Sequence, residues 1–434
     1  MKDVLEWGNE VENQRPQLVQ YDAWGNRIDE IVVCNGWNQL KKVSAEEGLI
    51  AIAYERKFKE YSRIYQFTKL YLFGPSSSIF TCPLAMTDGA ARLIELNGND
   101  KQKQGPYKHL TSRDPVEFWT SGQWMTEKTG GSDVGNSETI AVPSQDNNYL
   151  ISGYKFFTSA STSEMTILLA RAKDENNNFI KGSKGLSTFY LEMRRKEDNK
   201  LNNLTVHKLK NKVGTKGLPT AEIELTNSVG QLIGNKHQGI KVISTILNIT
   251  RIHNAVSCVS TMRRAIAVAT NYANKRTAFG KLLKDQPLHI QTLSDIQLEF
   301  QSAFYFLFHT IHLLGKIECS NATKEEEILF RLLTPLLKLY TAKQAVSVTS
   351  ECLEALGGTG YMEDEPYSLA KLWRDVQVCP IWEGTTNVLS LDVWRPLKSE
   401  GAYDIFVKDV STRINATSSS QNLANLVNAV KKGK

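Results

Sequence analysis

The hydrophobic period of the chain changes near Gly239, and this change constrains the fold more than any other feature. Over residues 118–234, apolar and polar residues alternate in short runs between turn-rich segments, which is typical of strands. After Gly239 the period becomes helical, with further helices predicted at 259–276, 288–317 and 324–356. A chain in this order holds a β unit followed by a bundle of long helices.

The region before the β unit is predicted to be mostly helical. Residues 45–73 are rich in helix-forming and aromatic residues, and Gly, Pro and Ser residues then break the chain at 74–78. The patterns predict an α+β protein with an N-terminal helical domain (1–117), a β domain (118–236) and a C-terminal four-helix bundle with a polar tail (237–434). Short strands without intervening helices favour an antiparallel barrel or sandwich for the middle domain.

The composition is that of an ordinary globular protein. Of the 434 residues, 41% are hydrophobic and 23% are charged, which excludes a disordered chain, a collagen-like chain and a coiled-coil rod. No uncharged apolar run reaches ~18 residues, so no membrane span is expected. The six cysteines are scattered without a Cys-x-x-Cys pair, which predicts a reducing compartment and no metal site. The acidic N-terminus resembles no secretory signal or mitochondrial presequence, so we expect an intracellular protein, either mitochondrial or cytoplasmic.

The charge does not predict a nucleic-acid ligand. The net charge of +6 is 52 basic minus 46 acidic residues, spread along the chain, whereas a nucleic-acid surface needs basic residues in a patch. The dense basic run at Lys431, Lys432 and Lys434 is interpreted as a solvated tail. No P-loop and no Gly-x-Gly-x-x-Gly fingerprint occurs, which argues against a Rossmann oxidoreductase.

Two segments of the β unit carry side chains suited to a cofactor. The run Trp-Met-Thr-Glu-Lys-Thr-Gly-Gly-Ser-Asp at 124–133 combines glycines, which allow close backbone approach, with the hydroxyls of Thr126 and Ser132. The run Gly-Tyr-Lys-Phe-Phe-Thr-Ser at 153–159 places aromatic rings, which stack on planar heterocycles, beside hydroxyls. The alternatives are an ordinary turn and a core strand with two buried Phe residues.

Two segments of the helical region carry charged groups that suit binding or catalysis. Arg276, in Arg-Thr-Ala-Phe-Gly, has a guanidinium that can hold a phosphate with two hydrogen bonds. It can equally complement a helix C-terminus. Glu383, in Ile-Trp-Glu-Gly-Thr-Thr-Asn, follows an apolar stretch, and such a carboxylate suits a general base for a weakly acidic C–H. The alternative is a glutamate at a helix start.

Together these segments resemble the acyl-CoA dehydrogenase family. The motifs are Met-Thr-Glu-x-x-Gly-Gly-Ser-Asp, Gly-x-Lys-x-Phe, Arg-x-x-Phe-Gly, Leu-Gly-Gly-x-Gly-Tyr and Trp-Glu-Gly-Thr, in this order. The resemblance covers residues 7–397 and is strongest to the AidB-like branch, which shares Ile-Trp-Glu-Gly and Leu-Asp-Val-x-Arg. It implies an acyl-CoA dehydrogenase-like fold with an antiparallel β-barrel in the middle. Glu354 stands where many relatives have Gln.

The resemblance also implies a cofactor and its ligands. FAD is implied between the β domain and the C-terminal helices, with adenosine and pyrophosphate contacts from a neighbouring subunit of a homodimer or homotetramer. Glu383 matches the catalytic base, and Arg251 is implied to orient Glu383 or bound acyl-CoA. Ser132 is implied at both the cofactor and the CoA phosphates. The implied FAD-binding residues on motif positions are Met125, Thr126 at the pyrimidine edge, Gly131, Ser132, Phe157 on the flavin ring, Ser159 near N5, Arg276, Phe279, Gly357 and Gly358 from the partner subunit, and Thr385 and Asn387 near the adenosine.

The implied reaction is α,β-dehydrogenation of a medium- or long-chain acyl-CoA thioester. Glu383 would remove the α proton while the β hydrogen leaves as hydride to flavin N5. Two alternatives stay open: a flavin oxidase that passes electrons to oxygen, and a low-turnover AidB-like flavoprotein that acts as an acyl-CoA or nucleic-acid binding module. Retention of Glu383 favours catalysis, and the scattered charge argues against nucleic acid. The sequence leaves the electron acceptor open.

Overall fold

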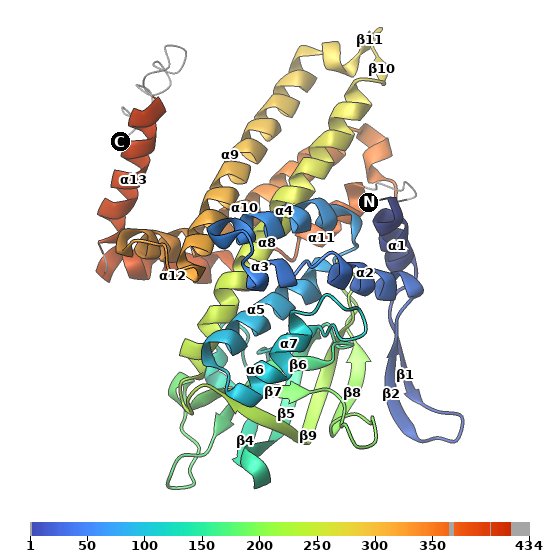
Figure 1. The fold of residues 1–434 in the computed structure, drawn as a ribbon. Helices are drawn as coiled ribbons and strands as arrows, with labels where there is room; N and C mark the ends of the chain where they lie inside the picture. Colours follow the sequence, from blue (N-terminus) through green and yellow to red (C-terminus); the bar gives the residue numbers. More distant parts are fainter. Residues whose placement is uncertain (1, 364–368, 400, 418–434) are drawn as a thin grey trace.

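The computed structural model of the chain describes residues 2–363, 369–399 and 401–417. A β-barrel lies at one end, and the helical regions cover it and extend away from it (Figure 1). In these described ranges, no helix is long and apolar enough to cross a membrane. The basic run at Lys431, Lys432 and Lys434 lies outside the described residues.

The middle of the chain closes into a barrel. In hydrogen-bonding order β6, β4, β5, β9 and β7 follow one another, and β7 pairs again with β6, while β3 joins β6 and β8 joins β9. Long β5 and β9 pair antiparallel along most of their length, with two irregularities that bend the sheet. The strands are β3 Ser121–Trp124, β4 Ile140–Pro143, β5 Asn148–Ser159, β6 Met165–Ala172, β7 Leu186–Glu192, β8 Leu204–Leu209 and β9 Thr220–Ile233.

The predicted barrel is confirmed with one difference in strand direction. The pairs β3–β6 and β4–β6 are parallel, whereas the sequence pattern predicted antiparallel strands only. The antiparallel β4–β5 hairpin lies between β3 and β6 in the sequence, and it provides the crossover connection from the end of β3 to the start of β6. Parallel pairing requires such a crossover.

In the described part of the chain, the C-terminal bundle contains three long helices and a shorter one that packs against the third. The structure has one continuous helix over Gly239–Ala273 where the sequence pattern suggested a new helix at 259, because no Gly or Pro interrupts residues 240–273. Thr323 and Glu326 form a capping box that starts the third long helix. The helices are α8 Gly239–Ala273, α9 Pro287–Glu318, α10 Lys324–Glu354, α11 Leu369–Val376, α12 Thr386–Ser399 and α13 Ala402–Thr417, and a short hairpin β10 Thr277–Ala278 and β11 Lys281–Leu282 joins α8 to α9.

The N-terminal region is helical but also contains an unpredicted hairpin. Its turn forms because backbone N–H groups of Trp24 and Asn26 donate to Asp22 Oδ1, and Gly25 adopts a positive φ of 82°. The hairpin lies beside β8 (Figure 1), and Gln20 Nε2 donates to the carbonyl of Val206. The elements are α1 Lys2–Asn13, β1 Gln17–Tyr21, β2 Arg27–Val32, α2 Asn35–Glu46, α3 Ala51–Glu55, α4 Ser62–Phe73, α5 Thr81–Asn97, α6 Asp100–Gln104 and α7 Pro106–Leu110.

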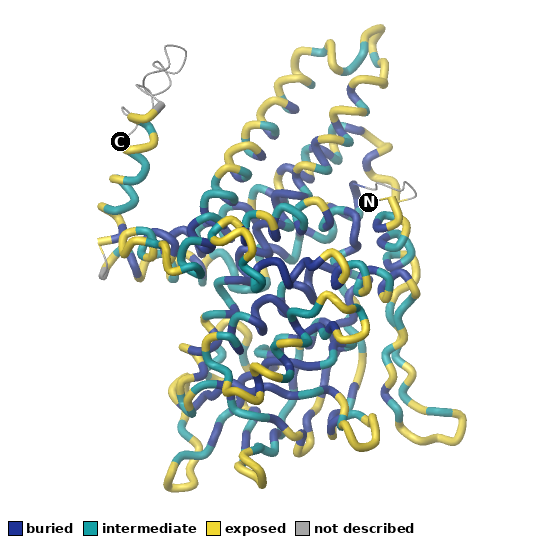
Figure 2. The backbone as a smooth tube through the Cα atoms, viewed as in Figure 1, coloured by how far each residue is buried: buried dark blue, intermediate teal, exposed yellow. Residues whose placement is uncertain are grey.

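Helix α8 runs through the buried centre of the molecule (Figure 2). On α5, an added Cβ at Gly89 would lie 2.8 Å from Ile246 Cγ2 of α8, so the missing side chain permits this close helix contact. Four buried titratable side chains then tie the helices together. Arg63 of α4 contacts Asp88 of α5 at 2.8 Å and Glu318 of α9 at 2.7 Å, and His253 of α8 lies 2.8 Å from Asp88.

This buried charge cluster predicts a large stability effect at Arg63. Burial alone would raise the pKa of Asp88, but the Arg63 charge and the His253 hydrogen bond hold it well below its usual range. Arg63→Met would leave Asp88 and Glu318 without their main cation, and we expect the free energy of unfolding to fall by about 3–5 kcal/mol. Denaturant unfolding followed by circular dichroism measures it.

The matched control removes an exposed ion pair. Lys408 pairs with Glu325 on the surface, and Lys408→Met should change the free energy of unfolding by less than about 1 kcal/mol. Equal effects of Lys408→Met and Arg63→Met would contradict the central role of the buried cluster.

Candidate functional site

A tight turn before α12 presents Glu383 toward both the barrel and the bundle. Glu383 has φ 56° and Gly384 has φ 103°, so two successive residues adopt left-handed backbone geometry. Thr250 Oγ1 of α8 donates to Glu383 Oε2 at 2.6 Å. Gln123 Nε2 of β3 lies 3.5 Å from the other carboxylate oxygen. Three segments far apart in sequence therefore orient one carboxylate.

Arg251 fixes the backbone of the same turn. Its side chain is buried, its Nε lies 3.4 Å from the carbonyl oxygen of Glu383, and its Nη1 donates to Asp392 of α12 at 2.6 Å. The residue before Glu383 is also tied to α8, since Trp382 Nε1 donates to Asn254 Oδ1 at 2.6 Å. Arg251 thus contacts the backbone of Glu383 rather than its carboxylate.

The glycine-rich loop after β3 rests on a buried ion pair that the sequence analysis missed. Lys155 Nζ lies 2.7 Å from Glu127 Oε1, and both side chains are almost completely buried. Glu127 also accepts hydrogen bonds from Thr139 Oγ1 at 2.6 Å and from the backbone N–H of Glu138 at 2.6 Å. Both residues lie inside motifs quoted from the sequence, Glu127 in the run at 124–133 and Lys155 in the run at 153–159, and this was the only sequence signal for the pair. The pair anchors the loop to the barrel wall.

Hydroxyl and glycine residues occupy this loop as expected. Thr126 is half-buried, and an added Cβ at Gly131 would lie 3.2 Å from Thr126 Cγ2, so the loop folds back closely on itself. Ser132 is exposed, while Met125 packs against the apolar cluster between α5, the barrel and α8. The loop therefore offers one hydroxyl at the barrel and one toward solvent.

The end of β5 presents an aromatic ring and a hydroxyl. Phe157 is 47% exposed, so the alternative of a core strand with two buried Phe residues is wrong for this residue. Lys210 Nζ lies 4.7 Å from its ring centre. Ser159 Oγ lies 3.1 Å from Thr220 Oγ1, which accepts a hydrogen bond from Lys212 Nζ at 3.0 Å. Burial lowers the pKa of Lys212 to about 8.

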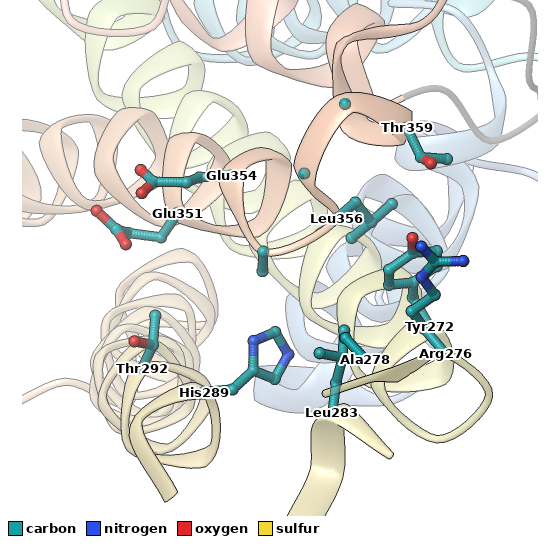
Figure 3. A pocket seen from close by; sticks show the side chains of 13 residues that line it. Tyr272, Arg276, Ala278, Leu283, His289, Thr292, Glu351, Glu354, Leu356 and Thr359 are labelled. Carbon is teal, nitrogen blue, oxygen red and sulfur yellow. The ribbon is translucent and has the colours of Figure 1, made fainter. Parts of the chain in front are cut away.

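A separate cavity of about 490 Å³ brings together three other predicted residues (Figure 3). Arg276, Gly357 and Gly358 all line it, although about eighty residues separate the arginine from the glycines. Nothing lies within 4 Å of an added Cβ at either glycine, and Gly357 has φ 59°. An open glycine backbone beside an arginine suits a phosphate group.

The same cavity has an acidic side. Glu351 and Glu354 face it opposite Arg276 and Tyr272 (Figure 3). Carboxylates repel phosphate but accept hydrogen bonds from sugar hydroxyls. The cavity therefore suits a ligand with an anionic part near Arg276 and hydroxyl donors near the glutamates.

The remaining predicted residues lie outside this cavity's lining. Phe279 is 98% exposed at the turn of the β10–β11 hairpin, where it and Gly280 have positive φ. Thr385 precedes α12 and its carbonyl accepts from the N–H of Leu389, and Asn387 is exposed in the first turn of α12. Phe279 and Asn387 are therefore exposed, while Thr385 is half-buried.

The barrel side of the site offers groups that suit a planar heterocycle such as a flavin ring. Gln123, which sequence reasoning did not single out, has its Oε1 buried without a hydrogen-bond partner among the described residues. This acceptor lies in the same region as Glu383, since the amide nitrogen of Gln123 contacts that carboxylate. A planar group with N–H donors, placed against the exposed ring of Phe157, matches these side chains.

Comparison with known proteins follows the same division of the chain. Residues 1–114 match the family model for the adaptive response protein AidB N-terminal domain. Residues 122–228 match the acyl-CoA dehydrogenase middle domain, and residues 237–397 match the acyl-CoA dehydrogenase C-terminal domain.

Two curated proteins and one solved structure are similar over most of the chain. Acyl-CoA dehydrogenase family member 11 of Caenorhabditis elegans is 46% identical over 91% of this chain, which spans 64% of that protein's length. The putative acyl-CoA dehydrogenase AidB of Escherichia coli is 30% identical, with 93% of this chain and 73% of AidB covered. The structure of Caenorhabditis elegans ACDH-11 in complex with C11-CoA has a TM-score of 0.94 at 43% identity, covering 99% of this chain and 74% of that one. The chain therefore belongs to the acyl-CoA dehydrogenase family and begins with an AidB-type N-terminal domain.

Proposed function

We propose that this protein is an FAD-dependent acyl-CoA dehydrogenase that acts on a medium- or long-chain acyl-CoA. The observation that carries the proposal is Glu383, whose carboxylate a left-handed turn places between α8 and β3. The similarity to a structure that holds C11-CoA supports this chain-length class. The similarity to acyl-CoA dehydrogenase family member 11 supports the activity.

Glu383 acts as the general base in this proposal. Thr250 and Gln123 hold its two oxygens, which fixes the direction in which the carboxylate points. Correct orientation within hydrogen-bond reach of the proton is the first requirement for general base catalysis. The backbone N–H of Glu383 donates to the thioester carbonyl, which acidifies the α proton that the Glu383 carboxylate removes.

Two sets of residues would hold FAD. Met125, Thr126, Gly131, Ser132, Phe157 and Ser159 lie on the loop after β3 and at the end of β5, and Ser132 also reaches the CoA phosphates. Arg276, Phe279, Gly357 and Gly358 would hold the pyrophosphate end of the partner subunit's FAD in a homodimer or homotetramer, with Thr385 and Asn387 near the adenosine. When bound, FAD supplies the acceptor for the β hydrogen and its electron pair.

A second candidate is a low-turnover flavoprotein that binds acyl-CoA. The N-terminal match to the adaptive response protein AidB is the observation that keeps this candidate open. Such a flavoprotein would bind the same ligand, acyl-CoA, as the dehydrogenase, but it would not need Glu383 as a base. A Glu383 variant therefore separates the two candidates.

We expect Glu383→Gln to slow anaerobic flavin reduction by acyl-CoA about 10²–10⁴-fold, since the amide cannot accept the α proton. Stopped-flow absorbance of the FAD-loaded protein measures the rate, and calorimetry measures acyl-CoA affinity, which should change little. Glu327→Gln, at an acidic position in the first turn of α10, is the matched control. Reduction of the Glu383→Gln protein at the wild-type rate would exclude Glu383 as the base.

We expect Arg276→Ala to weaken FAD binding by about tenfold or more, because one charge-assisted contact to the pyrophosphate is lost. Fluorescence titration of the flavin-free protein measures this affinity. Lys284→Ala, on an exposed residue of the same α8–α9 connection, should leave it unchanged. Equal affinities of wild type and Arg276→Ala would remove Arg276 from the FAD site.

A further inference from the structure

Lys338, in the middle of α10, is completely buried. Full burial of a lysine is costly unless its ammonium is paired or hydrogen-bonded. Its Nζ donates to the carbonyl oxygen of Gly384 at 2.5 Å. That carbonyl belongs to the residue directly after Glu383, so a buried charge contacts the turn that carries the proposed base.

The turn needs such support because its backbone is strained. Glu383 has φ 56°, a left-handed conformation that is unfavourable for a residue other than glycine. Arg251 of α8 contacts the carbonyl of Glu383, and Lys338 of α10 contacts the carbonyl of Gly384. Two cations on two helices therefore hold two successive carbonyls of one turn. Thr250 adds the third contact, on the carboxylate itself.

Several titratable groups face the Lys338 ammonium. They are Cys258 and Arg251 of α8 together with Cys379 and Glu383 of the segment between α11 and α12. Burial is the main cause that lowers the pKa of Lys338 to about 8; the nearby Arg251 acts in the same direction, while both cysteines and Glu383 oppose the shift. Lys338 is therefore charged at neutral pH and loses its charge in mildly alkaline solution, which makes its contribution measurable.

We propose that Lys338 is a positioning residue for Glu383, acting through the Gly384 carbonyl to keep the Glu383 carboxylate directed at the substrate α carbon. This inference rests on the proposed function of Glu383. A charge-assisted hydrogen bond to a carbonyl is roughly twice as strong as a neutral one. Misplacement of a base by about 1 Å can cost roughly 10²-fold in rate. Lys338 touches neither substrate nor cofactor in this role.

The first test measures the turn without any ligand. Amide hydrogen–deuterium exchange of peptides covering residues 381–387 should speed up by about fivefold or more in Lys338→Met, because local opening costs less free energy. Lys343→Met, at an exposed position on the same helix, is the matched control and should leave exchange unchanged. Unchanged exchange in a folded Lys338→Met protein would overturn the proposal.

The second test measures α-proton removal directly. When the enzyme's base removes the α proton of bound acyl-CoA reversibly in D₂O, deuterium replaces hydrogen at the α carbon. Mass spectrometry of the acyl-CoA measures the rate of this exchange. We expect Lys338→Met to slow this exchange about 10–10²-fold while acyl-CoA affinity stays within about threefold of wild type. Lys338→Gln, which keeps a neutral donor, should fall between wild type and Lys338→Met, and it replaces Lys338→Met if that variant fails to fold.

The pH profile separates positioning from general stabilisation. In wild type, the α-exchange rate should decline as pH rises through the Lys338 pKa, because the neutral amine binds the carbonyl less strongly. Lys338→Arg keeps the charge to higher pH and should shift this decline upward. If Glu383→Gln exchanges α protons like wild type, the proposed function fails. If Glu383→Gln is inactive but Lys338→Met matches wild type, only the role of Lys338 fails.

Discussion

The structure depends on a short buried polar stretch of α8. Within five residues, α8 buries the polar side chains of Thr250, Arg251, His253 and Asn254, and each of them needs a hydrogen-bond partner there. His253 turns to Asp88 of the N-terminal helices, while Thr250, Arg251 and Asn254 turn to the segment 382–383. This short stretch of α8 thus contacts both the buried charge cluster around Asp88 and the turn that carries Glu383. The hydrogen bonds that satisfy its buried polar groups are therefore the same ones that hold the proposed base in place.

The sequence was sufficient to predict the architecture because each region keeps one hydrophobic period. The alternating stretch around Ala221 lies in β9, and the helical stretch ending near Glu354 forms α10. The hairpin over residues 17–32 was missed because its strands are short and half exposed, and only the Asp22 turn marks it. The single long α8 was missed because its apolar residues occur on several faces, which obscures one periodic stripe.

Apart from Arg251, the site residues predicted from sequence all belong to a quoted motif. Glu383 and Arg276 stand out by residue type, and the structure puts the latter in a cavity with Gly357 and Gly358. Gln123 and Lys338 carry no local signal, since a glutamine in a strand and a lysine in a helix are ordinary. Their importance arises from tertiary packing, which brings β3 and α10 to the turn at 383–384 and which periodicity does not encode.

The central claim is that a carboxylate on this turn converts a saturated acyl-CoA into an enoyl-CoA. The most direct measurement is anaerobic titration of the purified wild-type protein with saturated acyl-CoAs of graded length, with absorbance and mass spectrometry recorded together. The account predicts a flavin spectrum that bleaches in proportion to added medium- or long-chain acyl-CoA, with a product two hydrogen masses lighter than the substrate. A flavin spectrum that stays oxidised while acyl-CoA binds unchanged would contradict it.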